Sequence, residues 1–108
     1  MSPNEYQRAA LRTAVPDQGI YNRLINGALG LAGESGEVAD YVKKFLYQGH
    51  EMNRDHVMEE VGDVLWYAAL TLDAVNCDME TCMVRNIEKL KRRYPNGFEA
   101  YCSTHREG

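Results

Sequence analysis

Residues 22–47 read NRLINGALGLAGESGEVADYVKKFLY, with apolar side chains recurring at steps of three and four. This spacing is typical of one apolar face of a helix. The face is made by Leu24, Ala28, Leu31, Val38, Val42 and Phe45. We therefore predict one long helix from Asn22 to Tyr47, ended by Gly49.

Four glycines recur at every third position of this predicted helix: Gly27, Gly30, Gly33 and Gly36. Each glycine costs about 1 kcal/mol of helix stability relative to alanine. One explanation is that the helix is broken or kinked at these residues. The other is that a neighbouring backbone or a ligand comes close. The glycines flank Glu34 on both sides, and this position favours the second explanation.

Three further helices are predicted from their start and stop signals. Ser2, Pro3 and Glu5 form a capping-box start, and the helix that follows ends before Pro16. Asp17, Gln18 and Gly19 then make a turn. The third helix is expected to begin at the N-cap Asp55 and to run to about Val75. Residues 76–78 end the third helix. Asp78 then caps a fourth helix from Met79 to Arg93, which Pro95–Gly97 end.

These elements predict an all-α fold. No segment alternates with the period of a strand, and the short polar loop at 49–55 should make the second and third helices antiparallel neighbours. We expect a single domain over residues 1–108 that resembles a four-helix bundle. A bundle this small buries limited apolar area, so we also expect a homo-oligomer that completes the fold.

Composition narrows the classes of function. The chain has 108 residues, 44% of them hydrophobic, and a net charge of −4. That charge argues against a nucleic-acid duplex as partner. No run approaches the roughly 20 apolar residues of a membrane span, and the N-terminus lacks the basic and apolar regions of a signal peptide. The three cysteines lack CxxC spacing, so we expect reduced thiols in the cytoplasm. A Cys77–Cys82 disulfide is the alternative.

Two carboxylate pairs, Glu34 with Glu37 and Glu60 with Asp63, carry the chemistry. Residues three apart share one face of a helix, and here that face also carries apolar side chains. Burying four unpaired carboxylates in a core would raise the free energy of the folded state. A divalent cation bound between them would remove this penalty. Oxygen ligands without His or Cys favour Mg²⁺, with Mn²⁺ as the alternative, over zinc. The competing interpretation is that these acids are solvated charges on exposed faces.

Three segments resemble the MazG-like nucleotide pyrophosphohydrolases of the all-α NTP pyrophosphatase superfamily. They are residues 30–40, GLAGESGEVAD, residues 59–67, EEVGDVLWY, and residues 86–98, NIEKLKRRYPNGF. The signature of the superfamily is E(E)xxE followed after a spacer by ExxD, and 22 residues, 38 to 59, separate Glu37 from Glu60 here. The resemblance is strongest over residues 28–98. One departure is that Gly33 stands where many members carry the first glutamate.

The resemblance implies Mg²⁺-dependent hydrolysis of a nucleoside triphosphate between its α and β phosphates, giving a monophosphate and pyrophosphate, in the cleansing of the nucleotide pool. Glu34, Glu37, Glu60 and Asp63 would hold the metal, and Glu34 is the first candidate for the base that accepts a proton from water. The resemblance also implies a homodimer or homotetramer whose subunits complete each other's sites.

Five further residues are candidates for binding the substrate's phosphates or base. Asn86, Lys89 and Arg93 lie on the predicted fourth helix, where their side chains could meet the triphosphate charge. Tyr67 lies one turn beyond Asp63 on the same face, and an ordinary core tyrosine is the alternative. Lys43 is the weakest of the five, because lysines near a helix C-terminus also favour its dipole.

Trp66 is expected to serve helix packing, with a subunit interface or base stacking as alternatives. We assign no role to His50, His56 or His105. The second functional interpretation is a non-catalytic helical module that binds nucleotides or partner helices. Gly33 is the feature that favours it, whereas the intact acid pairs favour the enzyme.

Overall fold

A computed structural model describes residues 1–16 and 19–98 of the chain. These residues form four helices: α1 (Pro3–Leu11), α2 (Ile20–Tyr47), α3 (Arg54–Ala74) and α4 (Met79–Arg93). Apart from an isolated bridge between Pro95 and Gly97, they contain no strand, so the predicted all-α fold is confirmed. Over these same ranges, no helix combines the length and the apolarity that crossing a membrane requires.

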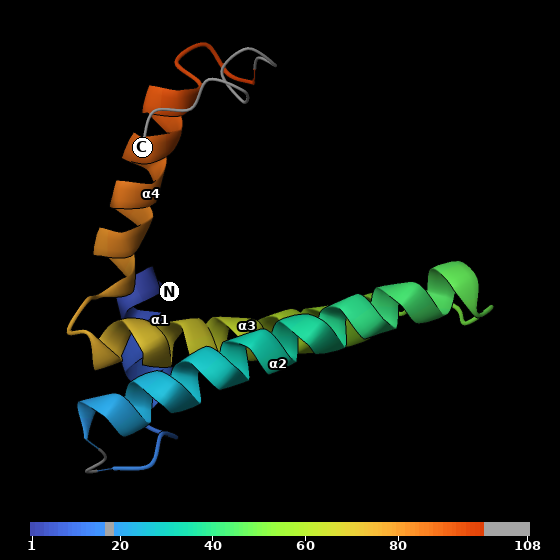
Figure 1. Cartoon of the computed structure of the whole chain (residues 1–108), viewed down its shortest axis with the longest axis horizontal. Helices are drawn as coiled ribbons and strands as arrows, with labels where there is room; N and C mark the ends of the chain where they lie inside the picture. The colour runs from blue at the N-terminus through green and yellow to red at the C-terminus, as the bar shows by residue number, and fades with distance from the viewer. Residues whose placement is uncertain (17–18, 99–108) are drawn as a thin grey trace.

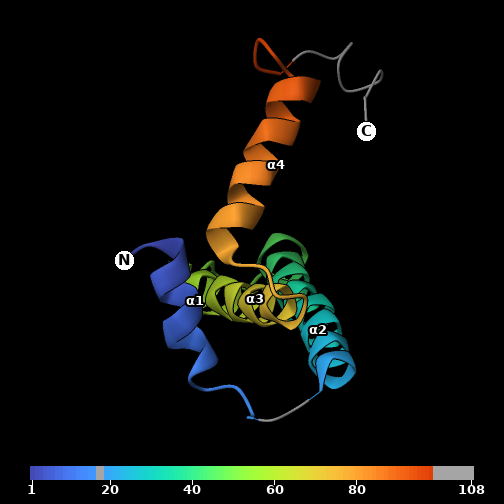
Figure 2. The ribbon, with the colours of Figure 1, turned by 90° about the vertical axis from the view of Figure 1, so that its left-hand side faces the viewer.

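The helices form two arms that meet at a corner. α2 and α3 run antiparallel and pack along each other as one long arm, as the short loop predicted. α1 packs across α3 near the corner, and α4 rises steeply from it as a second arm (Figure 1 and Figure 2). Within one chain, most of α4 therefore has no other helix beside it.

Capping side chains mark the starts of α1, α3 and α4, whereas the N-cap of α2 is Gly19, which has no side chain. The Ser2 hydroxyl accepts a hydrogen bond from the Glu5 amide at 3.1 Å, which confirms the capping box. Asp78 caps α4 as predicted. The prediction for α3 was wrong: Asn53, not Asp55, is the N-cap, because its Oδ1 accepts from the amides of Asp55 and His56.

The remaining ends lie at or close to the predicted residues. α2 begins at Ile20, two residues earlier than predicted, while Asp17 and Gln18 of the expected turn lie outside the described residues. α1 ends at Leu11, well before Pro16. α3 ends where residues 76–78 were expected to break it, because Asn76 adopts a positive φ of 58°. The amides of Asn76 and Cys77 then bond back to the last turn, as in a Schellman motif.

The corner between α3 and α4 is held by polar side chains of α1. Gln7 is buried, and its Nε2 donates to the carbonyls of Ala69 and Cys77 at 3.3 and 3.2 Å. Its Oε1 accepts from the amide of Met79 at 3.0 Å, at the start of α4. Asn4 also bonds to the start of α4, because its Oδ1 accepts from the amide of Glu80. These contacts satisfy backbone groups that a buried corner would otherwise leave unpaired, so α1 determines the direction in which α4 leaves.

Two of the four glycines of α2 allow the close approach of α3. A Cβ at Gly27 would overlap the Thr71 hydroxyl and lie 3.1 Å from the Thr71 Cα, and one at Gly30 would overlap the Tyr67 ring. Gly33 and Gly36, in contrast, have open space around them. α2 is continuous through all four. The expectation of close approach therefore holds for Gly27 and Gly30, and the neighbour is α3.

We predict that Gly27→Ala destabilises the protein by about 1–3 kcal/mol, the usual cost of overpacking, because α3 must move away. Gly33→Ala is the matched control, and it should stabilise by about 1 kcal/mol since only the helix preference changes. Urea unfolding followed by circular dichroism measures both. Equal effects of the two substitutions would contradict the close-packing assignment.

Candidate metal centre

The antiparallel pairing of α2 and α3 brings three carboxylates together. Glu34 of α2 and Glu60 and Asp63 of α3 each offer one oxygen, and these three oxygens lie within 4.8 Å of one another. Glu60 and Asp63 share a face because they are three residues apart on a helix. Glu34 reaches them from the opposite helix. Three carboxylates at this separation can hold one divalent cation between two helices.

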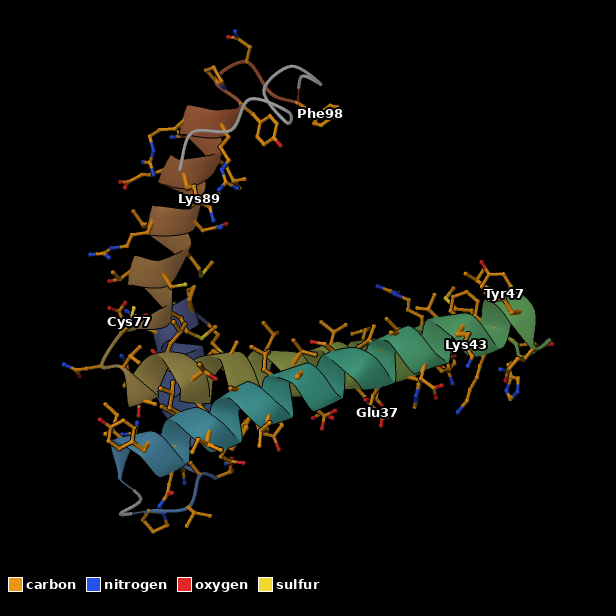
Figure 3. The ribbon with its side chains drawn as sticks, viewed as in Figure 1. Glu37, Lys43, Tyr47, Cys77, Lys89 and Phe98 are labelled. Atoms are coloured by element: carbon orange, nitrogen blue, oxygen red, sulfur yellow. The ribbon has the colours of Figure 1, made fainter. Side chains whose placement is uncertain are left out.

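Glu37 does not belong to this group of three. It lies three residues beyond Glu34 on α2, and its side chain is exposed. Figure 3 shows it on the edge of the long arm that faces away from α4. Its charge nevertheless contributes to the raised pKa of Glu34. The structure thus brings together three of the four predicted metal ligands and leaves Glu37 beside them.

The sequence interpretation that the four acids point into a core was wrong. Glu34 and Glu60 are half-buried, whereas Glu37 and Asp63 are exposed. The physical reason is that α2 and α3 cover only each other along most of the long arm, since α1 and α4 pack near the corner. The acids therefore line an open face of the helix pair.

The pKa of Glu34 shows how the charges of the cluster act on one another. Partial burial raises the pKa of the Glu34 carboxyl, and the nearby carboxylates of Asp63, Glu60 and Glu37 raise it further, in that order. Mutual repulsion of this kind disfavours the charged form. A cation among the three oxygens would reverse the effect. The cluster is therefore suited to a positively charged ligand.

Two aromatic side chains extend the site along α3. Glu34, Asp63, Trp66 and Tyr67 line a hollow of about 350 Å³. The rings of Trp66 and Tyr67 meet edge to face with centroids 5.0 Å apart. Trp66 Nε1 donates to the carbonyl of Ala10 and to the Thr13 hydroxyl, which confirms its predicted packing role. The Tyr67 ring lies over Gly30, so the helix contact places it beside the acids.

The predicted phosphate-binding residues lie on other parts of the molecule. Asn86, Lys89 and Arg93 are all on α4, and Figure 3 shows Lys89 midway along that arm, apart from the long arm that carries Glu37. Lys43 is exposed near the far end of α2 (Figure 3). Its neighbour Lys44 pairs with Asp40 at 2.9 Å. The fold of one chain thus separates the acids of the long arm from the basic residues of α4.

Two residues near the cluster were missed in the sequence. Burial raises the pKa of the Tyr6 hydroxyl, and the charge of Asp63 raises it further, which places this α1 side chain within reach of the cluster. His56 Nε2 lies 3.4 Å from Glu60 Oε1. Only the spacing of four residues between His56 and Glu60 could have signalled the second contact, and nothing in the sequence signalled the first.

Comparison with known proteins agrees with this geometry. The family model described as MazG nucleotide pyrophosphohydrolase domain matches residues 26–98, which include all of the acids discussed above. The chain belongs to this family. The MazG chain is also 38% identical over 101 residues to the Gene 37 protein of Mycobacterium phage L5, covering 85% of this chain and 88% of that protein. No solved structure matches it.

The residues of this MazG domain fit a hard divalent cation. The three clustered ligands are all carboxylate oxygens, half-buried or exposed, and carboxylates together with water are the usual partners of Mg²⁺ and Mn²⁺. The cluster contains no thiolate or imidazole among its three ligands, so a structural zinc site is disfavoured. Glu34, Glu60 and Asp63 would hold the ion.

We predict a pH-dependent effect of Glu34→Gln in the metal-free protein. Because the folded state raises the pKa of Glu34 above 4.5, its ionised form destabilises the fold once the pH exceeds that ordinary value. The variant should therefore melt at a higher temperature than the parent at neutral pH. The difference in melting temperature should vanish as the pH falls below the ordinary pKa of glutamate, since Glu34 is then protonated in both the folded and the unfolded protein.

Thermal melts with EDTA across this pH range measure the effect, and Glu88→Gln on α4 is the matched control, for which no change is expected. A constant difference at every pH would contradict the assignment of the shift to Glu34.

Proposed function

We propose that this MazG protein hydrolyses a nucleoside or deoxynucleoside triphosphate between the α and β phosphates, with Mg²⁺ or Mn²⁺, and serves in cleansing the nucleotide pool. The observation that carries the proposal is the convergence of Glu34, Glu60 and Asp63 from two helices. Membership of the family supports the reaction class. A bound cation would neutralise phosphate charge and make a bound water more acidic.

The side chains of the site divide the work as follows. Glu60, Asp63 and Glu34 would hold the cation, which would supply the charge that makes a bound water more acidic, and Glu37 would support the site from beside them. Glu34, which lies on the opposite helix from Glu60 and Asp63, would accept the proton of the attacking water. Tyr67 and the hollow beside it contact the nucleoside.

The polar and basic side chains of α4 would bind the substrate across a contact between subunits of a homodimer or homotetramer. α4 carries Asn86, Lys89 and Arg93, and in one chain this helix stands apart from the long arm. A second copy can place its α4 beside the acids, where these residues would meet the triphosphate. Lys43 has the same role near the far end of α2.

The apolar surface of the short arm supports such an assembly. Ile87 is 50% exposed and Leu90 40% exposed, although both lie on the apolar face of α4. With Tyr94 and Phe98 they line a hollow of about 460 Å³. Exposed apolar patches of this kind mark interaction sites. A second copy of the chain would cover this surface.

Two further expectations belong to the proposal. We place the protein in the cytoplasm, because Cys77 and Cys82 are free thiols. A nucleic-acid duplex is not expected as partner, given the negative net charge, and a membrane is not expected because no run approaches the roughly 20 apolar residues of a span. The alternative function is a non-catalytic nucleotide- or helix-binding module. Gly33 favours it, because the family's first acid is missing there although the space for it is open.

We predict that the purified protein releases pyrophosphate and a monophosphate from at least one member of a panel of NTPs and dNTPs, only with Mg²⁺ or Mn²⁺. Glu60→Gln should lower the rate by about 100-fold or more, as the loss of charge stabilisation at a reacting centre does. Glu59→Gln is the matched control on the same helix and should keep the rate.

Release that persists in EDTA, or that survives Glu60→Gln, would contradict the metal assignment. If the folded protein turns over no nucleotide, the binding module becomes the better description, and Gly33→Glu is then the substitution that should restore activity.

We also predict a dimer or tetramer in analytical ultracentrifugation at micromolar concentration. Ile87→Asp should shift the protein toward the monomer, because it places a charge on the apolar face of α4 that the interface would bury. Glu88→Gln, on the same helix, should leave the assembly intact. A parent protein that is monomeric at this concentration would refute the proposed homo-oligomer.

A further inference from the structure

We propose that His56 is a positioning residue that holds the carboxylate of Glu60 in place for the metal. The proposal rests on the proposed function, since it assumes that Glu60 is a metal ligand. His56 lies one turn before Glu60 on α3, and its Nε2 is 3.4 Å from Glu60 Oε1. A carboxylate can only accept, so a proton on Nε2 would make His56 the donor of this contact.

The His56 ring is fixed from the side of α2. The ring of Tyr41 stacks against it at a tilt, with the two centroids 4.4 Å apart. Tyr41 in turn is held by the loop between the helices, because its hydroxyl accepts from the amide of Asn53 at 2.5 Å and donates to the carbonyl of Glu51. Phe45 also meets the Tyr41 ring edge to face, with centroids 5.7 Å apart.

The backbone of His56 is fixed by the same residues. Its amide donates to Asn53 Oδ1, the side chain that caps α3. Asn53 is thus bonded to Tyr41 through its own amide and to His56 through its side chain. These contacts connect the start of α3 to Tyr41 of α2 beside the His56 ring.

The pair differs from an ordinary contact between two exposed residues four apart on a helix, which is worth little. The Glu60 side chain is only 20% exposed, while that of His56 is 42% exposed. Glu60 also belongs to the three-carboxylate cluster with Glu34 and Asp63. A contact from His56 to Glu60 would restrict the rotamer of this carboxylate beside the cluster, as partners of metal ligands usually do.

The test is Mn²⁺ binding to the full-length metal-free protein at neutral pH, followed by electron paramagnetic resonance of the free ion. His56→Phe keeps a ring to pack on Tyr41 but removes the donor, and it should weaken binding by about tenfold or more. His56→Gln restores an N–H donor and should bind close to the parent. His50→Phe, in the exposed loop, is the matched control.

Thermal melts without metal separate positioning from a merely structural role, because His56→Phe and His56→Gln should then melt within the same narrow range. The proposal is overturned if His56→Phe binds Mn²⁺ as tightly as the parent, or if His56→Gln loses as much affinity as His56→Phe. Parent and Glu60→Gln proteins that bind Mn²⁺ equally would overturn the metal site itself. A parent that binds and a Glu60→Gln that does not would show that site to be correct, whatever His56 does.

Discussion

The close packing of α2 against α3 is the contact on which the rest of this protein depends. Gly27 and Gly30 lack the Cβ atoms that would overlap Thr71 and the Tyr67 ring, so the two helices approach closely at this point. The same approach brings Glu34 within reach of carboxylates on the other helix. A glycine in a helix costs about 1 kcal/mol, and here that cost is offset by the contact that builds the acidic cluster.

The second constraint is the polar corner made by α1. Gln7 and Asn4 bond to the backbone at the end of α3 and the start of α4, which sends α4 away from the long arm (Figure 2). Because the buried apolar core is small, with Ala69, Leu70, Ala74 and Met79 as its members, much apolar surface is left exposed on both arms. Association of copies would bury that surface and add stability that one chain lacks.

The acidic cluster is the place where we expect binding of a cation and stability of the metal-free fold to oppose each other. Burial and three neighbouring carboxylates raise the pKa of Glu34, and a cation would relieve the repulsion among them. The surrounding structure holds the acids despite that repulsion: the Tyr67 ring lies over Gly30, and Trp66 is bonded to α1. Perturbed groups of this kind cluster at functional sites.

The sequence by itself determined the four helices, most of their ends and the two acid pairs, because helical periodicity and capping are local properties. It also determined the family, through acids at fixed spacing. Only the tertiary structure decided that Glu37 stands outside the cluster, that α3 fills the space at Gly27 and Gly30 but not at Gly33, and that α4 points away from the acids. His56 likewise became visible only through its contacts with Glu60 and Tyr41. These facts depend on the crossing of α2 with α3 and on a corner built by Gln7, 62 residues from Ala69 in sequence. Contacts between residues so far apart leave no periodic signal in a single sequence.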